Sequence, residues 1–294
     1  MKKVGSFFFT LIPFLLVFGI QLLVTCFMTG ISFLTEFAWY SVTNPISYDK
    51  IINNLTTLWT STSFNTSLMI IYAVISIAIF APWYYMKYDG CYLPKIQTTF
   101  HPVSLIGILM LVPGMQYLST YIVSFTATLF PDWLKTYEDL LKTAGLDSNL
   151  SLGMFLYSVI LAPLCEELIF RGVTMRQAKK AIPFWAANLM QAILFGAFHM
   201  NMIQGIYAFC LGLILGYVCE KGGSIYYSIL LHMLFNFWGT VISQFVTIEN
   251  STFAVLFWFL FAIVMTAGGL FIFHFGLDKR KSDSQTIDAN YQYQ

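Results

Sequence analysis

Long apolar stretches recur along the whole chain, and this recurrence constrains its fold more than any other feature. A helix of about 20 predominantly apolar residues crosses a bilayer. Charged residues make up only 10% of the chain, which is typical of integral membrane proteins. We therefore predict an all-α polytopic membrane protein with about eight transmembrane helices. The predicted spans are residues 7–33, 66–86, 103–130, 151–171, 184–201, 203–219, 224–245 and 252–276.

The lysines and arginines predict the orientation of these helices. If the N-terminus is cytoplasmic, eleven basic residues fall in inner segments and three in outer segments, leaving Arg171 uncounted because it lies close to two carboxylates. Because basic residues concentrate on the cytoplasmic side, both termini are expected in the cytoplasm. The inner set is Lys2, Lys3, Lys87, Lys95, Arg176, Lys179, Lys180, Lys221, Lys279, Arg280 and Lys281; the outer set is Lys50, Lys135 and Lys142.

No repeat or low-complexity domain interrupts the chain, so one membrane domain is the simplest organisation. Apolar residues recur at helical spacing beside charged ones from Pro131 to Leu146, which predicts a short interfacial helix on the outer surface. Residues 45–60 are a second candidate for such a helix. The predicted parts are helices 1–3 in 1–130, the outer amphipathic segment in 131–150, helices 4–7 in 151–245, the last transmembrane helix in 246–278, and a polar, disordered cytoplasmic tail in 279–294.

Three polar clusters lie within the apolar spans. Ionisable groups at membrane depth are costly, so they are functional candidates by default. Three such clusters would each need a separate structural explanation if none of them had a function. The clusters are Glu166, Glu167 and Arg171; Phe195 and His199; and His232 and Asn236.

The two glutamates of the first cluster have different surroundings. Glu167 and Arg171 are four residues apart on a helix, so they face each other and can form an ion pair. Glu166 points about 100° away and has no cation nearby in the sequence, which makes it a candidate general base. Pro163 predicts a kink close to these residues. A purely architectural salt bridge with one spare glutamate is the alternative.

The histidine clusters also follow helical spacing. Phe195 and His199 share one helix face, and His232 and Asn236 share another. His232 and Asn236 offer two hydrogen-bond donors to a developing oxyanion. The alternatives are a histidine that only packs and a pair that forms hydrogen bonds between helices.

Two further interpretations concern the same region. Glu166, His199 and His232 would supply three ligands of a catalytic zinc site, although no His-Glu-x-x-His helix is present. Cys165 is a poor nucleophile candidate because adjacent helix positions do not face each other. For Glu166 to meet the histidines, we expect residues 172–186 to project into the cytoplasm as an exposed hairpin, with the site opening there or laterally.

The three motifs together resemble a known family. Glu-Glu-x-x-x-Arg, Phe-x-x-x-His and His-x-x-x-Asn, in this order on three membrane helices, are similar to the CAAX-protease and bacteriocin-processing (CPBP or Abi) intramembrane proteases, which are related to the Ras-converting CAAX endopeptidase. The resemblance covers about residues 151–240. It implies a catalytic helical core and a glutamate-type mechanism without a metal cofactor. By this resemblance Glu166 activates water, His199 orients it, His232 and Asn236 stabilise the oxyanion, Glu167 and Arg171 support the site, and Phe195 packs.

The leading functional hypothesis is therefore an intramembrane endopeptidase acting on a membrane-associated protein or peptide. Abundant lysine, asparagine, isoleucine and phenylalanine are typical of a low-GC bacterial gene, and bacteria generally lack prenylated CAAX substrates. The resemblance then implies peptide maturation, bacteriocin self-immunity or trimming of a membrane protein at the cell membrane, beside CAAX-type processing. The alternative is a non-proteolytic membrane scaffold or regulator of a sensor kinase or cell-envelope enzyme. A transporter would show inverted repeats, which we do not find. A net charge of +1 argues against a nucleic-acid partner.

Overall fold

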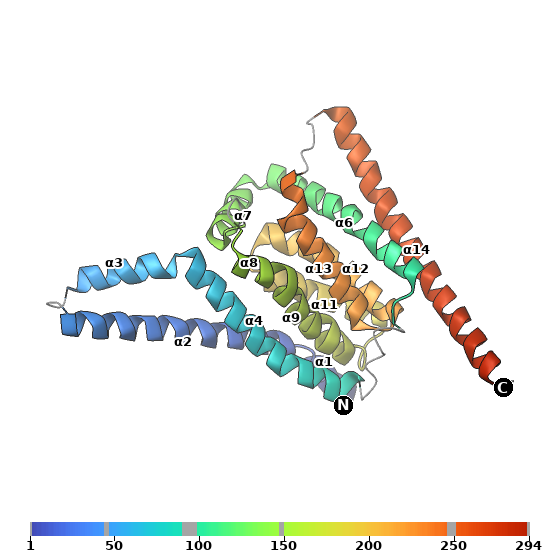
Figure 1. Cartoon of the computed structure of the whole chain (residues 1–294), viewed down its shortest axis with the longest axis horizontal. Helices are drawn as coiled ribbons and strands as arrows, with labels where there is room; N and C mark the ends of the chain where they lie inside the picture. Colours follow the sequence, from blue (N-terminus) through green and yellow to red (C-terminus); the bar gives the residue numbers. More distant parts are fainter. Residues whose placement is uncertain (1, 44–46, 90–98, 147–149, 246–250, 293–294) are drawn as a thin grey trace.

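The computed structural model describes residues 2–43, 47–89, 99–146, 150–245 and 251–292. These residues form helices joined by short connections and contain no strand, which confirms the all-α prediction (Figure 1). The elements are α1 (Lys2–Phe9), α2 (Ile12–Thr43), α3 (Tyr48–Trp59), α4 (Thr62–Tyr84), η1 (Tyr85–Asp89), α6 (Pro102–Leu129), α7 (Pro131–Ala144), α8 (Leu152–Leu156), η2 (Tyr157–Leu161), α9 (Ala162–Glu167), η3 (Leu168–Met175), α10 (Arg176–Ala178), α11 (Phe184–Phe198), α12 (Met202–Gly222), α13 (Ile225–Thr240), η4 (Ile242–Phe245) and α14 (Thr252–Gln292).

Seven helices within the described residues are long and apolar enough to cross a membrane, and each overlaps a predicted span. The remaining predicted span, 184–201, is the 15-residue helix α11. At 1.5 Å per residue it is about 22 Å long, shorter than the hydrocarbon core. The seven are Phe7–Val42, Thr62–Tyr88, Pro102–Leu129, Leu152–Ala178, Met202–Gly222, Ile225–Phe245 and Thr252–Arg280.

A sharp turn after His199 explains why α11 is short. Met200 adopts a left-handed conformation with φ 54°. The side chain of Asn201 then accepts a hydrogen bond from the Gln204 amide at 3.0 Å and begins α12. Apolar residues lie on both sides of this turn, so the hydropathy of the sequence does not reveal it.

Two helix pairs flank the central bundle (Figure 1). Helices α2 and α3 extend away from the bundle side by side, and Trp59 Nε1 donates to Ser32 Oγ at 2.8 Å between them. On the other side α14 lies along α6. Gly107 and Gly276 line this contact, where an added Cβ would meet the backbone of the opposite helix. The α14 backbone is helical through Gln292, and the last two residues of the predicted tail lie outside the described residues.

The predicted amphipathic segment forms as α7, which packs against α4, α6 and α12. Tyr137 on this helix contacts Tyr207 of α12, with their hydroxyl oxygens 3.5 Å apart. The helix ends at Gly145, which has φ 68°, a conformation that favours glycine. The second candidate interfacial segment also contains a helix, α3.

The span Leu152–Ala178 carries the first polar cluster through the middle of the bundle. It runs through α8, η2, α9, η3 and α10, and every residue from Leu168 to Met175 is buried. The expected exposed hairpin at 172–186 is therefore wrong for its first half. Gly172 lies against Tyr84, and Tyr88 donates to Gln177 Oε1 at 2.7 Å, so α4 and η1 cover this segment. Exposed residues begin at Lys179.

Candidate active site

The backbone around Pro163 is irregular, as its sequence predicts. Proline removes a backbone donor and its ring crowds the carbonyl four residues earlier, here Val159. Val159 lies in the π-helical segment η2, which precedes α9 directly. The wider π-helix accommodates the proline, so the expected kink takes the form of a π-helical turn.

Glu167 and Arg171 form the predicted ion pair. Arg171 Nη1 donates to Glu167 Oε1 at 2.8 Å, and both side chains are fully buried. Arg171 Nη2 also donates to the carbonyl of Gly212 on α12 at 3.3 Å. The pair thus links α9 and η3 to α12 through a buried charge.

His232 joins this pair to Glu166. Its Nδ1 lies 2.9 Å from Glu167 Oε1, and its Nε2 lies 3.6 Å from Glu166 Oε2. A carboxylate oxygen only accepts, so Nδ1 carries the proton in the shorter contact. The structure therefore brings the glutamate motif of α9 together with the histidine of α13.

Phe195 connects the second histidine to the same cluster by packing. Its ring centroid lies 4.9 Å from that of His199 and 5.8 Å from that of His232. The guanidinium carbon of Arg171 lies 4.4 Å from the Phe195 ring centroid, a cation–π contact. His199 Nδ1 donates to the Phe195 carbonyl at 2.8 Å, so its Nε2 is the atom not used in this bond.

Asn236 makes a different contact from the one expected. Its Nδ2 donates to the backbone carbonyl of Ser158 in η2 at 2.8 Å. Both ring nitrogens of His232 face carboxylates. In this conformation one N–H of the Asn236 amide is used by the Ser158 carbonyl, and His232 Nε2 lies 3.6 Å from Glu166, beyond hydrogen-bond distance.

The sequence did not identify every group that builds the site. Gly212 offers its carbonyl to Arg171 and also to Gln191 Nε2, the latter at 2.9 Å. Gln191 is an uncharged polar residue in an apolar helix, and this signal was available in the sequence. The Ser158 and Gly212 carbonyls carry no such signal because their roles depend on backbone geometry.

The zinc alternative needs Glu166, His199 and His232 to converge on one point. Within the described parts of the chain, no group of three or more His, Cys, Asp or Glu side chains is arranged to hold a metal ion. We therefore derive no step through a metal.

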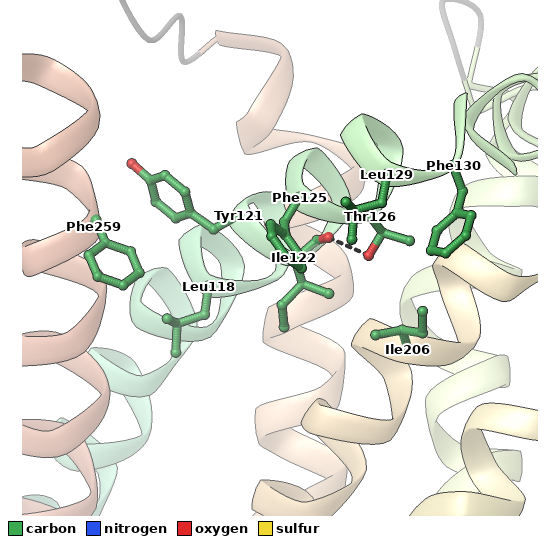
Figure 2. Close-up of a pocket in the computed structure, with 9 residues that line it drawn as sticks. All are labelled: Leu118, Tyr121, Ile122, Phe125, Thr126, Leu129, Phe130, Ile206 and Phe259. Atoms are coloured by element: carbon green, nitrogen blue, oxygen red, sulfur yellow. Dashed lines mark hydrogen bonds between the residues drawn. The ribbon is translucent and has the colours of Figure 1, made fainter. Parts of the chain in front are cut away.

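Two apolar cavities lie near this region. One of about 520 Å³ surrounds the α11–α12 turn and is lined by Gly196, Ala197 and Met200, which are neighbours of His199. The other, of about 600 Å³, lies between α6, α12 and α14 (Figure 2). Ile206 lines both cavities. The second cavity has no charged residue in its lining, so it is suited to apolar groups and not to hydrolysis.

The helical fold and this buried carboxylate–imidazole cluster define a polytopic membrane protein with a candidate hydrolytic site. Residues 148–238 match the family model described as "Type II CAAX prenyl endopeptidase Rce1-like". The matched segment contains all seven candidate residues, and the match confirms the resemblance read from the three motifs. The match supports the assignment of this chain to the CAAX-type intramembrane proteases. The comparisons with curated proteins and with solved structures found no match.

Proposed function

We propose that the chain is a glutamate-type intramembrane endopeptidase of the cell membrane. The observation that carries this proposal is the contact between Glu166 and His232. Glu166 is mostly buried and faces His232 Nε2 at 3.6 Å, while Glu167 and Arg171 hold the opposite side of the imidazole. Burying these four ionisable groups in one place is costly, which makes them candidates for a functional site.

In the proposed reaction Glu166 accepts a proton from water as the water oxygen attacks a peptide carbonyl carbon. The tetrahedral intermediate collapses when the C–N bond breaks and the proton passes to the departing nitrogen, giving a carboxylic acid and an amine. A single proton shared by Glu166 Oε2 and His232 Nε2 would give each atom a hydrogen-bond partner, since either atom can donate it to the other. Their 3.6 Å separation leaves room to shorten when substrate binds.

The other residues support this chemistry. Glu167 fixes the orientation of the His232 ring through Nδ1, as buried carboxylates do for catalytic histidines. His199 is placed by the Phe195 carbonyl and orients the water through its remaining nitrogen. Asn236 holds the η2 backbone, and we propose that it turns its amide to the oxyanion when substrate is present. No metal or organic cofactor takes part in these steps.

The cavity at the α11–α12 turn is the proposed binding place for an apolar part of the substrate. Its lining includes residues directly beside His199, and its volume is about 520 Å³. A membrane-associated protein or peptide would supply such a segment. Peptide maturation, bacteriocin self-immunity and CAAX-type processing all use substrates of this class.

The test compares membranes from cells that express wild type, Glu166→Gln or no protein, at matched abundance. Released peptides and new membrane-protein termini are identified by mass spectrometry. Products found with wild type alone support proteolysis and name the substrate. Glu138→Gln is the matched control because Glu138 is exposed on α7, far in sequence from the site. If Glu166→Gln yields the same products as wild type, the scaffold alternative replaces this proposal.

A further inference from the structure

Helix α4 lies outside the segment that matches the family, yet it contributes side chains next to Glu166. It packs against α9, and its Tyr72 is 94% buried. The Tyr72 hydroxyl lies beside the thiol of Cys165, the residue before Glu166, and its ring lies 6.4 Å from that of Phe198. Helix α9, which α4 contacts, carries Glu166.

The Tyr72 hydroxyl is a buried donor without a conventional acceptor. Among the described residues, Tyr72 Oη and Ser76 Oγ belong to the few buried side-chain atoms with no hydrogen-bond partner. The neighbouring Cys165 sulfur is a weak acceptor and does not replace a carbonyl or carboxylate. Leaving a hydroxyl unpaired in an apolar interior destabilises the fold, so such a group calls for an explanation.

One of the two donors predicted for the oxyanion, the Asn236 amide, is turned to a protein group in this conformation. Asn236 Nδ2 donates to the Ser158 carbonyl, and both nitrogens of His232 face carboxylates. A tetrahedral intermediate needs donors that point to its oxygen and are already in place. Tyr72 lies on α4, which packs against α9, whereas His232 contacts Glu166 from α13.

We propose that Tyr72 donates a hydrogen bond to the carbonyl oxygen of the scissile peptide as negative charge develops there. The proton stays on Tyr72, and the bond is strongest in the tetrahedral intermediate. This inference rests on the proposed endopeptidase function. It adds to the site a residue that the matched segment does not contain, and it gives the unpaired hydroxyl an acceptor.

The matched control is Ser76, one helical turn further along α4. It is fully buried, has no hydrogen-bond partner, and lies beside the same Cys165 thiol. Tyr72→Phe and Ser76→Ala each remove one unpaired buried hydroxyl. The two variants therefore separate a role in the reaction from a general effect of polarity in α4.

The experiment uses the full chain in proteoliposomes with internally quenched peptides that carry an apolar segment. We expect Tyr72→Phe to lower kcat about 100-fold with KM within twofold of wild type, because one oxyanion donor contributes a factor of this order. Ser76→Ala should retain kcat within threefold. Thermal unfolding of Tyr72→Phe should occur no lower than that of wild type, since removing an unpaired hydroxyl does not weaken the fold.

The outcomes separate the two proposals. If wild type cleaves no faster than Glu166→Gln, the endopeptidase function fails and the role of Tyr72 fails with it. If wild type cleaves faster than Glu166→Gln but Tyr72→Phe equals wild type, the role of Tyr72 alone is overturned. A loss in Tyr72→Phe accompanied by a lower unfolding temperature, or matched by Ser76→Ala, overturns it as well.

Discussion

Glu167 Oε1 accepts hydrogen bonds from His232 Nδ1 at 2.9 Å and from Arg171 Nη1 at 2.8 Å, so one carboxylate oxygen serves two donors. All three side chains are at least 97% buried. Glu167 therefore neutralises a buried cation and also orients the histidine that faces Glu166. We therefore assign Glu167 mainly to the stability of the fold and Glu166 to the proposed reaction.

Glu167→Ala should destabilise the protein strongly. The variant leaves Arg171 as an uncompensated buried charge, and breaking such a pair costs about 3–5 kcal/mol. Chemical or thermal unfolding of the purified protein in detergent measures this loss. The double variant Glu167→Leu/Arg171→Met removes both charges and should recover most of the stability without activity. Glu166→Gln should unfold close to wild type, and equal losses in Glu166→Gln and Glu167→Ala would contradict this division of roles.

The sequence predicted the transmembrane helices and the Glu167–Arg171 pair because both depend on local periodicity. Hydropathy identifies a span from composition alone, and residues four apart on a helix face each other whatever surrounds them. The placement of His232 between two glutamates is different, since it depends on how α13 packs against α9. Local spacing carries no information on such contacts, and the order of the motifs indicated only that they belong together.

The same reasoning explains the predictions that were wrong or incomplete. The exposed hairpin at 172–186 followed from the assumption that α11 spans the membrane, and α11 is too short to do so. Asn236 donates to a backbone carbonyl in the π-helical segment η2. Pro163 predicted a kink there but not a π-helix. Tyr72 was not a candidate because a tyrosine in an apolar span is most often a packing residue.

Asn236→Ala should lower both stability and activity. The Ser158 carbonyl would lose its donor in a buried segment, which costs about 1–3 kcal/mol. Unfolding measurements and the peptide assay report the two effects separately. Gln244→Ala is the control, because Gln244 also donates to a backbone carbonyl, that of Thr240 at 2.7 Å, but is exposed. A loss of activity at unchanged stability would show that the Ser158 contact matters little and that Asn236 acts on the substrate.

Gly216→Val should disrupt the packing of α12 against α11. A Cβ at Gly216 would overlap Asn188 Oδ1, and Asn188 in turn donates to the Leu213 carbonyl and accepts from Gln191. Overpacking of this kind costs about 1–3 kcal/mol or more. The amount of folded protein in membranes and its unfolding temperature measure the effect. Gly19→Val on α2 is the control, since nothing lies within 4 Å of its Cβ position. Equal behaviour of both variants would contradict the close contact.

Metal chelators should leave the proposed hydrolysis unchanged within twofold. No set of three His, Cys, Asp or Glu side chains in the described residues is arranged to hold a metal, and Glu166 and His232 face each other at 3.6 Å. The measurement is the cleavage rate of quenched peptides after treatment with 1,10-phenanthroline or EDTA. Inactivation that is reversed by added zinc would contradict the glutamate mechanism.

His199→Asn should slow cleavage strongly while it preserves the fold. The amide nitrogen of asparagine can take the place of Nδ1 and donate to the Phe195 carbonyl, but it provides nothing at the position of Nε2. If Nε2 orients the attacking water, kcat should fall about 100-fold, the scale of general acid–base assistance. The unfolding temperature should stay within a few degrees of wild type because the Phe195 contact remains. His199→Gln is the complementary variant, since its longer amide reaches the Nε2 position and loses the Nδ1 contact. Recovery of part of the rate in His199→Gln but not in His199→Asn would assign the role to Nε2. The reverse pattern would show that His199 acts through its bond to Phe195 and only supports the packing of the site.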